Sequence, residues 1–407
     1  MTKRFVGAVA LSLFFQVSAF AQWGFGGPQG GGGVPDANKT ADVNYAGDGK
    51  TYHTLDIYIP KEAKDSYPVV IHTYGSAWSM NNMKGSADLS TICAAYAKAG
   101  YAVVTPNHRS ASDAIYPAQL HDIKAVVRFV RGNAAKYKFD TNFVAVSGFS
   151  SGGHLSSLVA TTCGLKEGKS GSVTVDLVGA LGEFTSFSSC ADAAVLWSPP
   201  TDIYTMNPIS IGGSGTMEGA FIGVEREGNK DKWMVASSPY YASDDDPPVI
   251  IFHGTKDQVV NIEQSKELYD SLKHHNVVVE LDTVPNGEHG GNVMYATENL
   301  NKAVAFLDKA REAKAAAAVV PPDTSKQDTS VTDTSKTDTL PPDTQSIAIH
   351  SMRVPMLAPV SYSVYSLDGT LVSRSSVLNR QALRPGVYYV VSKYNTGERK
   401  MFRIVKR

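Results

Sequence analysis

The sequence has few cysteines, almost no net charge, and a single long apolar run that lies at its start. Only three cysteines occur in 407 residues, and no CxxC or Cys/His spacing typical of a zinc site is present. The formal net charge of −1 gives the chain no overall attraction to nucleic acid or to an anionic membrane surface. We therefore expect no metal or organic cofactor and no nucleic-acid partner.

The single long apolar run begins at Phe5, directly after Lys3 and Arg4, and closes on the A-x-A triplet at residues 19–21. This pattern is typical of a signal peptide that is cleaved after Ala21. A membrane anchor is the alternative, but the run is short for a bilayer span. We expect residues 1–21 to be a signal peptide, no transmembrane span, and a protein that is secreted or held at the cell surface.

Export would permit a disulfide bond, because the compartments outside the cytoplasm are oxidising. Cys163 and Cys190 flank a polar insertion and could pair, and the sequence leaves both the paired and the free forms open. Cys93 lies on the face of a predicted helix, where it is expected to be a buried small apolar residue.

Composition divides the rest of the chain into four segments. Residues 22–36 form a glycine-rich leader, and residues 37–313 form a long globular region. Residues 314–345 are rich in Pro, Thr and Asp and have too little apolar surface to fold, which predicts a linker. Residues 346–407 show alternating apolar segments and predict a small, separate β-rich unit.

Strand and helix patterns alternate through the globular region. Short runs rich in branched residues, such as PVVIHT, YAVVTP, NFVAVS and PPVIIFHG, predict buried strands. Amphipathic segments such as AQLHDIKAVVRFVRG lie between most of them. This order predicts an α/β fold, with a mostly parallel sheet covered by helices on both faces. Such sheets bind ligands beyond the carboxyl ends of their strands.

A G-x-S-x-G motif stands at one of these strand ends. Gly148, Ser150 and Gly152 follow the strand AVS and precede a predicted helix. The sharp turn in such a motif exposes the serine hydroxyl above the sheet, and the start of the helix favours negative charge nearby. A tight turn that merely contains serine is the alternative. In this context we predict that Ser150 is a nucleophile.

A serine hydroxyl needs a base to become reactive, and two later strand ends supply candidates. Asp257 follows the strand PPVIIF, and His289 lies in a glycine-rich loop after LDTVP. The chain order Ser, Asp, His is one of the orders in which catalytic triads occur. Glu288 is the alternative acid. The other candidate bases, His72, His154 and His253, are expected to be structural.

Acyl transfer also needs hydrogen-bond donors for the oxyanion. The loop YGSAW follows the strand PVVIHT, and its small residues allow a close approach to Ser150. We predict that the amides of Ser76, Ala77 and Ser151 form an oxyanion hole and that Trp78 contacts the substrate. The alternative is an ordinary turn with a packed tryptophan.

Several segments between residues 45 and 312 resemble one known family. YGSAW, the stretch from NHRSASDAIYPAQLHD onward, VAVSGFSSGGHLSSL, PPVIIFHGTKDQVV and NGEHGG are similar to α/β-hydrolase esterases related to bacterial feruloyl and acetyl esterases that act on xylan. The resemblance implies the α/β-hydrolase fold, with Ser150 as nucleophile, Asp257 as acid and His289 as base. Family members often carry H-G-G-G-W where this chain has Tyr74 to Trp78, so the support of that loop differs here. Asp122 matches a family aspartate that we expect to be structural.

The C-terminal segment, with LRPGVYYVVSKY and a basic end, resembles the β-sandwich sorting domains of type IX secretion substrates. A small accessory module that binds acidic polysaccharide or the cell surface is the alternative. Together, these features predict a secreted serine esterase that removes acetyl or feruloyl groups from plant hemicellulose such as xylan. A serine peptidase of the same fold and an inactive hydrolase-like binding module are the other two hypotheses. Segments 164–191 and 200–237 are expected to roof the substrate pocket.

Overall fold

A computed structural model describes residues 33–319, except residue 214, and four strands between residues 361 and 406. The chain divides into two compact units, Met1–Pro321 and Pro322–Arg407. The predicted signal peptide and most of both the predicted leader and the predicted linker lie outside the described residues. No helix among the residues described is long and apolar enough to cross a membrane.

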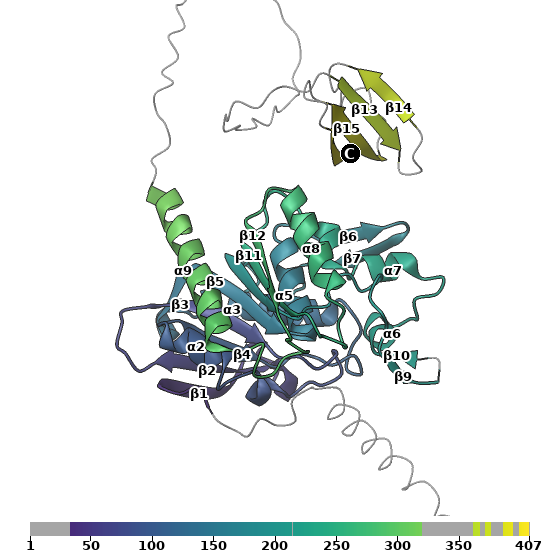
Figure 1. Cartoon of the computed structure of the whole chain (residues 1–407). Coiled ribbons are helices and arrows are strands. Elements are labelled where there is room, and N and C mark those ends of the chain that lie inside the picture. Colours follow the sequence, from purple (N-terminus) through teal and green to yellow (C-terminus); the bar gives the residue numbers. More distant parts are fainter. Residues whose placement is uncertain are drawn as a thin grey trace, which may run out of the picture. The chain divides into compact units, whose positions relative to one another are not determined.

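The first unit is built on an eight-stranded sheet with the order β1-β2-β4-β3-β5-β8-β11-β12 (Figure 1). The pairs β1–β2 and β2–β4 are antiparallel, and every other neighbouring pair is parallel. The predicted mostly parallel sheet is thus confirmed. The strands are β1 (Ala37–Asn44), β2 (Thr54–Pro60), β3 (Tyr67–Thr73), β4 (Ala102–Pro106), β5 (Phe139–Phe149), β8 (Ala193–Trp197), β11 (Val249–Gly254) and β12 (Val279–Val284).

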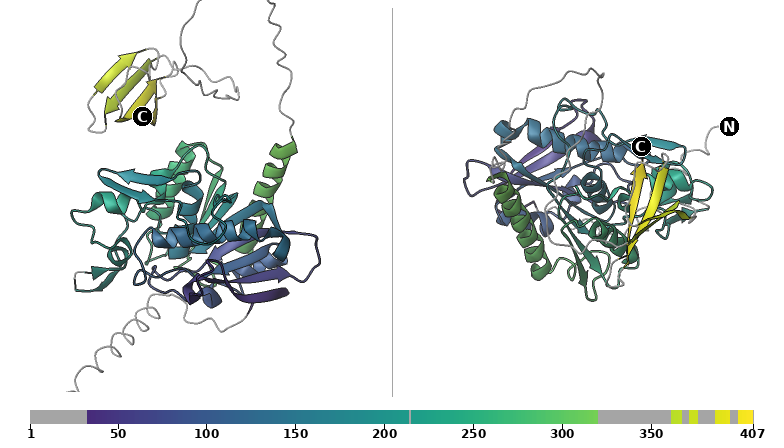
Figure 2. Two further views of the ribbon diagram at one scale, coloured as in Figure 1. Left: turned by 180° about the vertical axis from the view of Figure 1, so that it is seen from behind. Right: turned by 90° about the horizontal axis from the view of Figure 1, so that it is seen from above.

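Helices cover both faces of this sheet (Figures 1 and 2). The helices of the first unit are α2 (Ile92–Lys98), α3 (Ala118–Gly132), α4 (Ala134–Tyr137), α5 (Ser151–Thr161), α6 (Met217–Ile222), α7 (Lys230–Met234), α8 (Glu263–His274) and α9 (Thr297–Val319), with short 3₁₀ turns η1 (Thr51–His53), η2 (Lys84–Ser86) and η3 (Ser238–Tyr241). Apolar residues of α3, α5 and α8 join one core cluster, and those of α2 and α9 join another. Along β3, Val69 and Ile71 belong to the first cluster and Val70 to the second. This alternation explains why the strand is a continuous apolar run, since both of its faces are buried.

The structure contains two small hairpins that the sequence did not predict, and helix α9 is longer than predicted. The segment after α5 forms a hairpin of β6 (Glu167–Ser170) and β7 (Val173–Asp176), and a disulfide joins Cys163 to Cys190. A second small hairpin, β9 (Ser210–Gly212) with β10 (Gly215–Thr216), precedes α6. Helix α9 continues to Val319, into the segment predicted as linker, because its alanine-rich end has high helix propensity. Cys93 is free and buried, as expected.

The described strands of the second unit form one antiparallel sheet with the order β14-β13-β15-β16. They are β13 (Ser361–Ser366), β14 (Leu371–Ser375), β15 (Gly386–Lys393) and β16 (Arg399–Lys406). The predicted β-rich character of this segment agrees with these strands. A second, facing sheet, which a β-sandwich would need, is not found among the described residues of this unit.

Candidate active site

Ser150 stands at the junction of β5 and α5, in a backbone conformation with φ 53° and ψ −124°. Non-glycine residues rarely adopt positive φ, so the surroundings must hold this turn in place. A Cβ atom at Gly152 would lie 2.1 Å from the carbonyl oxygen of Thr73, and one at Gly148 would lie 2.3 Å from the carbonyl carbon of Gly152. The two flanking glycines of the motif therefore leave the room that this turn requires.

The structure brings Ser150, Asp257 and His289 together, although they are far apart in the sequence. His289 lies in the loop between β12 and α9, and its Nε2 atom is 2.9 Å from Ser150 Oγ. Its Nδ1 atom is 2.7 Å from Asp257 Oδ2. If Nδ1 carries the proton and donates to Asp257, Nε2 is left to accept the proton of the serine hydroxyl. The arrangement can therefore activate Ser150 as a nucleophile.

Asp257 is held in the loop that follows β11. Its Oδ1 atom accepts hydrogen bonds from the amides of Val259 and Val260, both at 2.9 Å. Burial by itself raises the pKa of this carboxyl, but hydrogen bonds and charge from His253 and His289 outweigh burial and lower the pKa below its ordinary value. Asp257 therefore stays ionised at neutral pH and can orient His289. Glu288, the alternative acid, is exposed.

The histidines that the sequence left as alternative bases have structural partners. His253 Nδ1 is 2.6 Å from Ser265 Oγ, and its Nε2 is 2.9 Å from the carbonyl oxygen of Val260. His72 Nδ1 is 2.9 Å from Ser147 Oγ. Both rings are fully buried. They hold the loops and strands around the site, which agrees with the structural role predicted for them.

The loop after β3 approaches Ser150 closely. A Cβ atom at Gly75 would lie 2.8 Å from Ser150 Cβ, so only glycine fits there without displacing the nucleophile. Of the three amides predicted to bind an oxyanion, that of Ser76 donates to Ser151 Oγ at 2.8 Å. No hydrogen bond from the amides of Ala77 or Ser151 occurs within the described residues. These two amides are therefore free to bind a ligand oxygen, whereas the Ser76 amide already has a partner.

Trp78 is buried, which differs from the prediction that it contacts the substrate. Its side chain is only 1 % exposed and stacks on Phe221 of α6, with ring centroids 4.6 Å apart. The indole Nε1 donates to His154 Nδ1 at 3.2 Å. The ring face is thus covered by Phe221 and its only polar atom is bonded to His154, so neither is available to a ligand. The packed tryptophan that the sequence left as the alternative describes Trp78 better.

His154 links the loop that carries Trp78 to the segment before η3. Its Nδ1 accepts from Trp78, so its Nε2 carries the proton and donates to the carbonyl oxygen of Ala236 at 2.7 Å. Burial of the ring lowers the pKa of His154 from 6.5 to about 4. The structural role predicted for His154 agrees with these two contacts, but its partners are distant in the sequence and no local pattern indicates them.

This buried histidine makes stability depend on pH. Between about pH 6.5 and pH 4, the unfolded chain binds a proton at His154 that the folded chain does not bind. The free energy of unfolding should therefore fall as the pH drops through this window, by up to about 3 kcal/mol at 1.4 kcal/mol per pKa unit. Urea unfolding at a series of pH values measures this slope. His154→Gln should reduce the dependence of the free energy of unfolding on pH, whatever the variant's absolute stability. An unchanged dependence would show that His154 is not its source.

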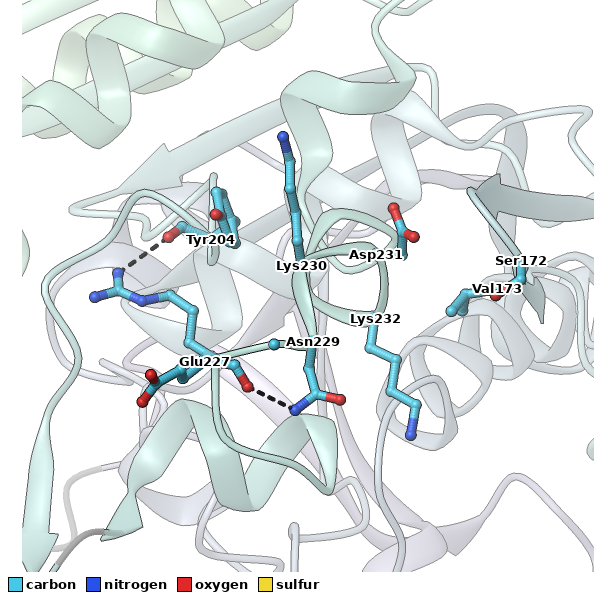
Figure 3. A pocket seen from close by; sticks show the side chains of 10 residues that line it. Ser172, Val173, Tyr204, Glu227, Asn229, Lys230, Asp231 and Lys232 are labelled. Atoms are coloured by element: carbon cyan, nitrogen blue, oxygen red, sulfur yellow. Dashed lines mark hydrogen bonds between the residues drawn. The ribbon is translucent and has the colours of Figure 1, made fainter.

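The two segments predicted to roof the pocket form a separate hollow of about 680 Å³ (Figure 3). None of the predicted site residues lines it. Its wall includes Tyr204, and Arg226 donates to the carbonyl oxygens of Tyr204 and Met206. Lys230 and Lys232 point away from one another in Figure 3. The second segment does cover the loop beside Ser150 through the contact between Phe221 and Trp78.

Solved structures similar to this chain include two carbohydrate esterases. A truncated carbohydrate esterase from gut microbiota is 39% identical, with a TM-score of 0.66, and the match covers 69% of this chain and 99% of the other. A bifunctional GH43-CE protein of Bacteroides eggerthii is 41% identical, with a TM-score of 0.64, over 67% of this chain and 35% of the other. An esterase B from Lactobacillus rhamnosis, at 20% identity and a TM-score of 0.60, shares the fold. The predicted α/β-hydrolase fold of the first unit is thus confirmed.

Curated relatives of this chain include the probable carboxylic ester hydrolase LipM of Mycobacterium tuberculosis, which is 26% identical over 244 residues, or 58% of this chain and 52% of the relative. Esterase LipQ of the same organism is 25% identical over 256 residues, which are 62% of this chain and 57% of the relative. The chain spans about half the length of the curated relatives it matches. The BD-FAE family profile matches residues 55–272, which is more than half of the sequence. The chain therefore belongs to the BD-FAE family of α/β-hydrolases.

Proposed function

We propose that this protein is a serine carboxylic ester hydrolase that acts on acylated carbohydrate. The observation that carries the proposal is the pair of contacts at 2.9 Å and 2.7 Å that join Ser150, His289 and Asp257. Hydrolysis of an ester by this route needs a nucleophile, a base and an oriented acid within hydrogen-bond reach of one another. The similarity to carbohydrate esterases supports the choice of an ester over a peptide substrate.

In the proposed reaction, Ser150 Oγ attacks the ester carbonyl carbon while His289 Nε2 takes its proton. Asp257 keeps Nδ1–H in place and stabilises the positive charge that develops on the imidazole. His289 then gives the proton to the leaving alcohol, and an acyl-enzyme remains on Ser150. Water attacks this acyl group by the same route, releasing the acid and restoring Ser150. No step of this route calls on a metal ion or a cofactor.

For the substrate, we propose acetyl or feruloyl esters on plant hemicellulose such as xylan. The support is the signal peptide pattern at residues 1–21 and the names of the two carbohydrate esterases that this chain resembles. Purified protein is assayed for acid release from acetylated xylan and from feruloyl esters. A series of p-nitrophenyl esters with increasing acyl size shows whether the enzyme prefers a small acyl group such as acetyl or a large one such as feruloyl. If the protein hydrolyses small aryl esters but releases no acid from acetylated xylan or from feruloyl esters, the proposed esterase activity stands and the proposed substrate is wrong.

The two other hypotheses predict different outcomes in the same assays. A serine peptidase would cleave peptide substrates and leave esters of xylan intact. A binding module without activity would hydrolyse nothing and would not react with a fluorophosphonate probe. Since the described site contains a hydrogen-bonded nucleophile and base, we expect both probe labelling and ester hydrolysis.

We also propose that the C-terminal unit directs the exported enzyme to the cell surface or through a secretion system. Its described strands form an antiparallel sheet, and its sequence resembles known sorting domains. Removal of residues 346–407 should leave hydrolysis of small esters unchanged and abolish surface display or release in the native host. Unchanged display of the shortened chain would defeat this role.

A further inference from the structure

The hydroxyl of Ser151 lies between the two chain segments that border the nucleophile. Ser151 follows Ser150 directly, and its Oγ atom accepts a hydrogen bond from the amide of Ser76 at 2.8 Å. Ser151 and Ser76 are almost fully buried, at 1 % and 2 % exposure respectively. The loop of Ser76 touches the nucleophile at Gly75, where a Cβ atom would lie 2.8 Å from Ser150 Cβ. The Ser151 hydroxyl therefore occupies an N–H group that was expected to face the substrate.

This hydroxyl has a proton to give. A serine hydroxyl donates one hydrogen bond and can accept two. Within the described residues, Ser151 Oγ makes no hydrogen bond other than the one it accepts from Ser76. The accepted bond fixes the position of the oxygen and leaves its own O–H free to turn toward a ligand. Because the group is buried, a bond from it to a developing negative charge would be little weakened by water.

We propose that the Ser151 hydroxyl is a catalytic residue that donates a hydrogen bond to the oxyanion, in place of the Ser76 amide. The inference rests on the proposed esterase function. As Ser150 Oγ bonds to the acyl carbon, the π electrons of the carbonyl move onto its oxygen, and the serine proton moves to His289 Nε2. The Ser151 hydroxyl keeps its proton throughout and donates to the oxyanion, together with the amides of Ala77 and Ser151. Side-chain hydroxyls serve as oxyanion donors when they are held in position beforehand.

The competing interpretation is purely structural. In that case Ser151 Oγ only fastens the loop of Ser76 to helix α5, and the oxyanion is bound by the two free amides. Ser76 has a buried hydroxyl of its own, without a hydrogen-bond partner in the described structure. A decisive experiment must therefore separate the two hydroxyls from one another and separate hydrogen bonding to the oxyanion from fastening of the loop.

The test compares an ester with the thionoester that carries sulfur at the carbonyl position, because sulfur accepts hydrogen bonds poorly. The ratio of kcat/KM for the two substrates reports how strongly the hole binds an oxyanion. Ser151→Ala should lower kcat for the ester by about 10-fold to 100-fold and reduce this ratio. We expect less than the loss of about 10²-fold to 10³-fold typical of an oxyanion donor, because the freed Ser76 amide becomes available. Ser151→Thr, which keeps a hydroxyl, should retain most of the ratio.

Matched variants keep the result interpretable. Ser157→Ala removes another buried hydroxyl of α5, which donates to the carbonyl oxygen of His154, and should leave the ratio unchanged. Ser76→Ala removes the loop hydroxyl but keeps the amide, so a fall in the ratio in this variant and not in Ser151→Ala would assign the donor to Ser76 and overturn the inference. If Ser151→Ala lowers kcat but leaves the ratio unchanged, the hydroxyl only fastens the Ser76 loop to helix α5, and the inference is overturned. Unchanged kinetics of Ser151→Ala would overturn it as well. An inactive wild-type protein would defeat the proposed function itself, and the inference with it.

Discussion

Ser150→Ala is expected to lower kcat for ester hydrolysis by about 10⁶-fold, since loss of the nucleophile alone removes nearly everything that a catalytic triad contributes. The variant should also lose labelling by a fluorophosphonate probe, which reacts only with an activated serine. The structural reason is the contact of 2.9 Å between Ser150 Oγ and His289 Nε2, through which the base can take the proton of this serine. Stopped and continuous assays with a p-nitrophenyl ester measure the loss, and circular dichroism verifies that the variant folds.

Ser147→Ala is the matched control, because Ser147 belongs to a second arrangement of the same residue types. His72 Nδ1 lies 2.9 Å from Ser147 Oγ, and His72 Nε2 lies 3.3 Å from Asp88 Oδ2. Tyr96 also reaches Ser147 Oγ with its hydroxyl, at 3.0 Å. Ser147 is fully buried within β5, so no substrate can reach it. Ser147→Ala should keep probe labelling, and labelling that survives in Ser150→Ala but is lost in Ser147→Ala would reverse the assignment.

The convergence of the site could be predicted from the sequence because it depends on topology. Parallel strands end at the same edge of a sheet, so residues that directly follow β5, β11 and β12 must meet there. Ser150, Asp257 and His289 each follow such a strand. The glycines around Ser150 added a local signal, since they mark a turn that other residues cannot make.

What the sequence could not predict depends on side-chain packing across the sheet edge. The burial of Trp78 against Phe221 joins residues that are more than a hundred positions apart, and neither segment shows a periodic pattern that reveals the other. The same holds for the hydrogen bond from Ser76 to Ser151, which depends on a rotamer rather than on spacing. The hairpins β6–β7 and β9–β10 were also missed, because their strands are only two to four residues long, which is too short for an alternating pattern to indicate a strand.

Asp257→Asn is expected to lower kcat by about 10⁴-fold while leaving the fold intact, as the same change does in a serine protease triad. The asparagine oxygen can still accept from the amides of Val259 and Val260, so the loop keeps its shape. The side-chain amide, however, can donate to His289 Nδ1 and favour the tautomer that carries its proton on Nε2. That tautomer cannot take the proton of Ser150. The negative charge that stabilises the protonated imidazole is lost as well.

Measurement of kcat against pH for Asp257→Asn tests this explanation directly. If the wrong tautomer limits the variant, hydroxide can take over part of the work of the base, and activity should recover as the pH rises into the alkaline range. The low pKa of Asp257 predicts that the wild-type enzyme shows no such recovery, because its carboxylate is already ionised. Glu288→Gln changes the neighbouring carboxyl and should leave kcat within about 2-fold, as expected for an exposed group outside the site. A loss of less than about 10-fold in Asp257→Asn, or a large loss in Glu288→Gln, would show that Asp257 is not the carboxylate that orients His289.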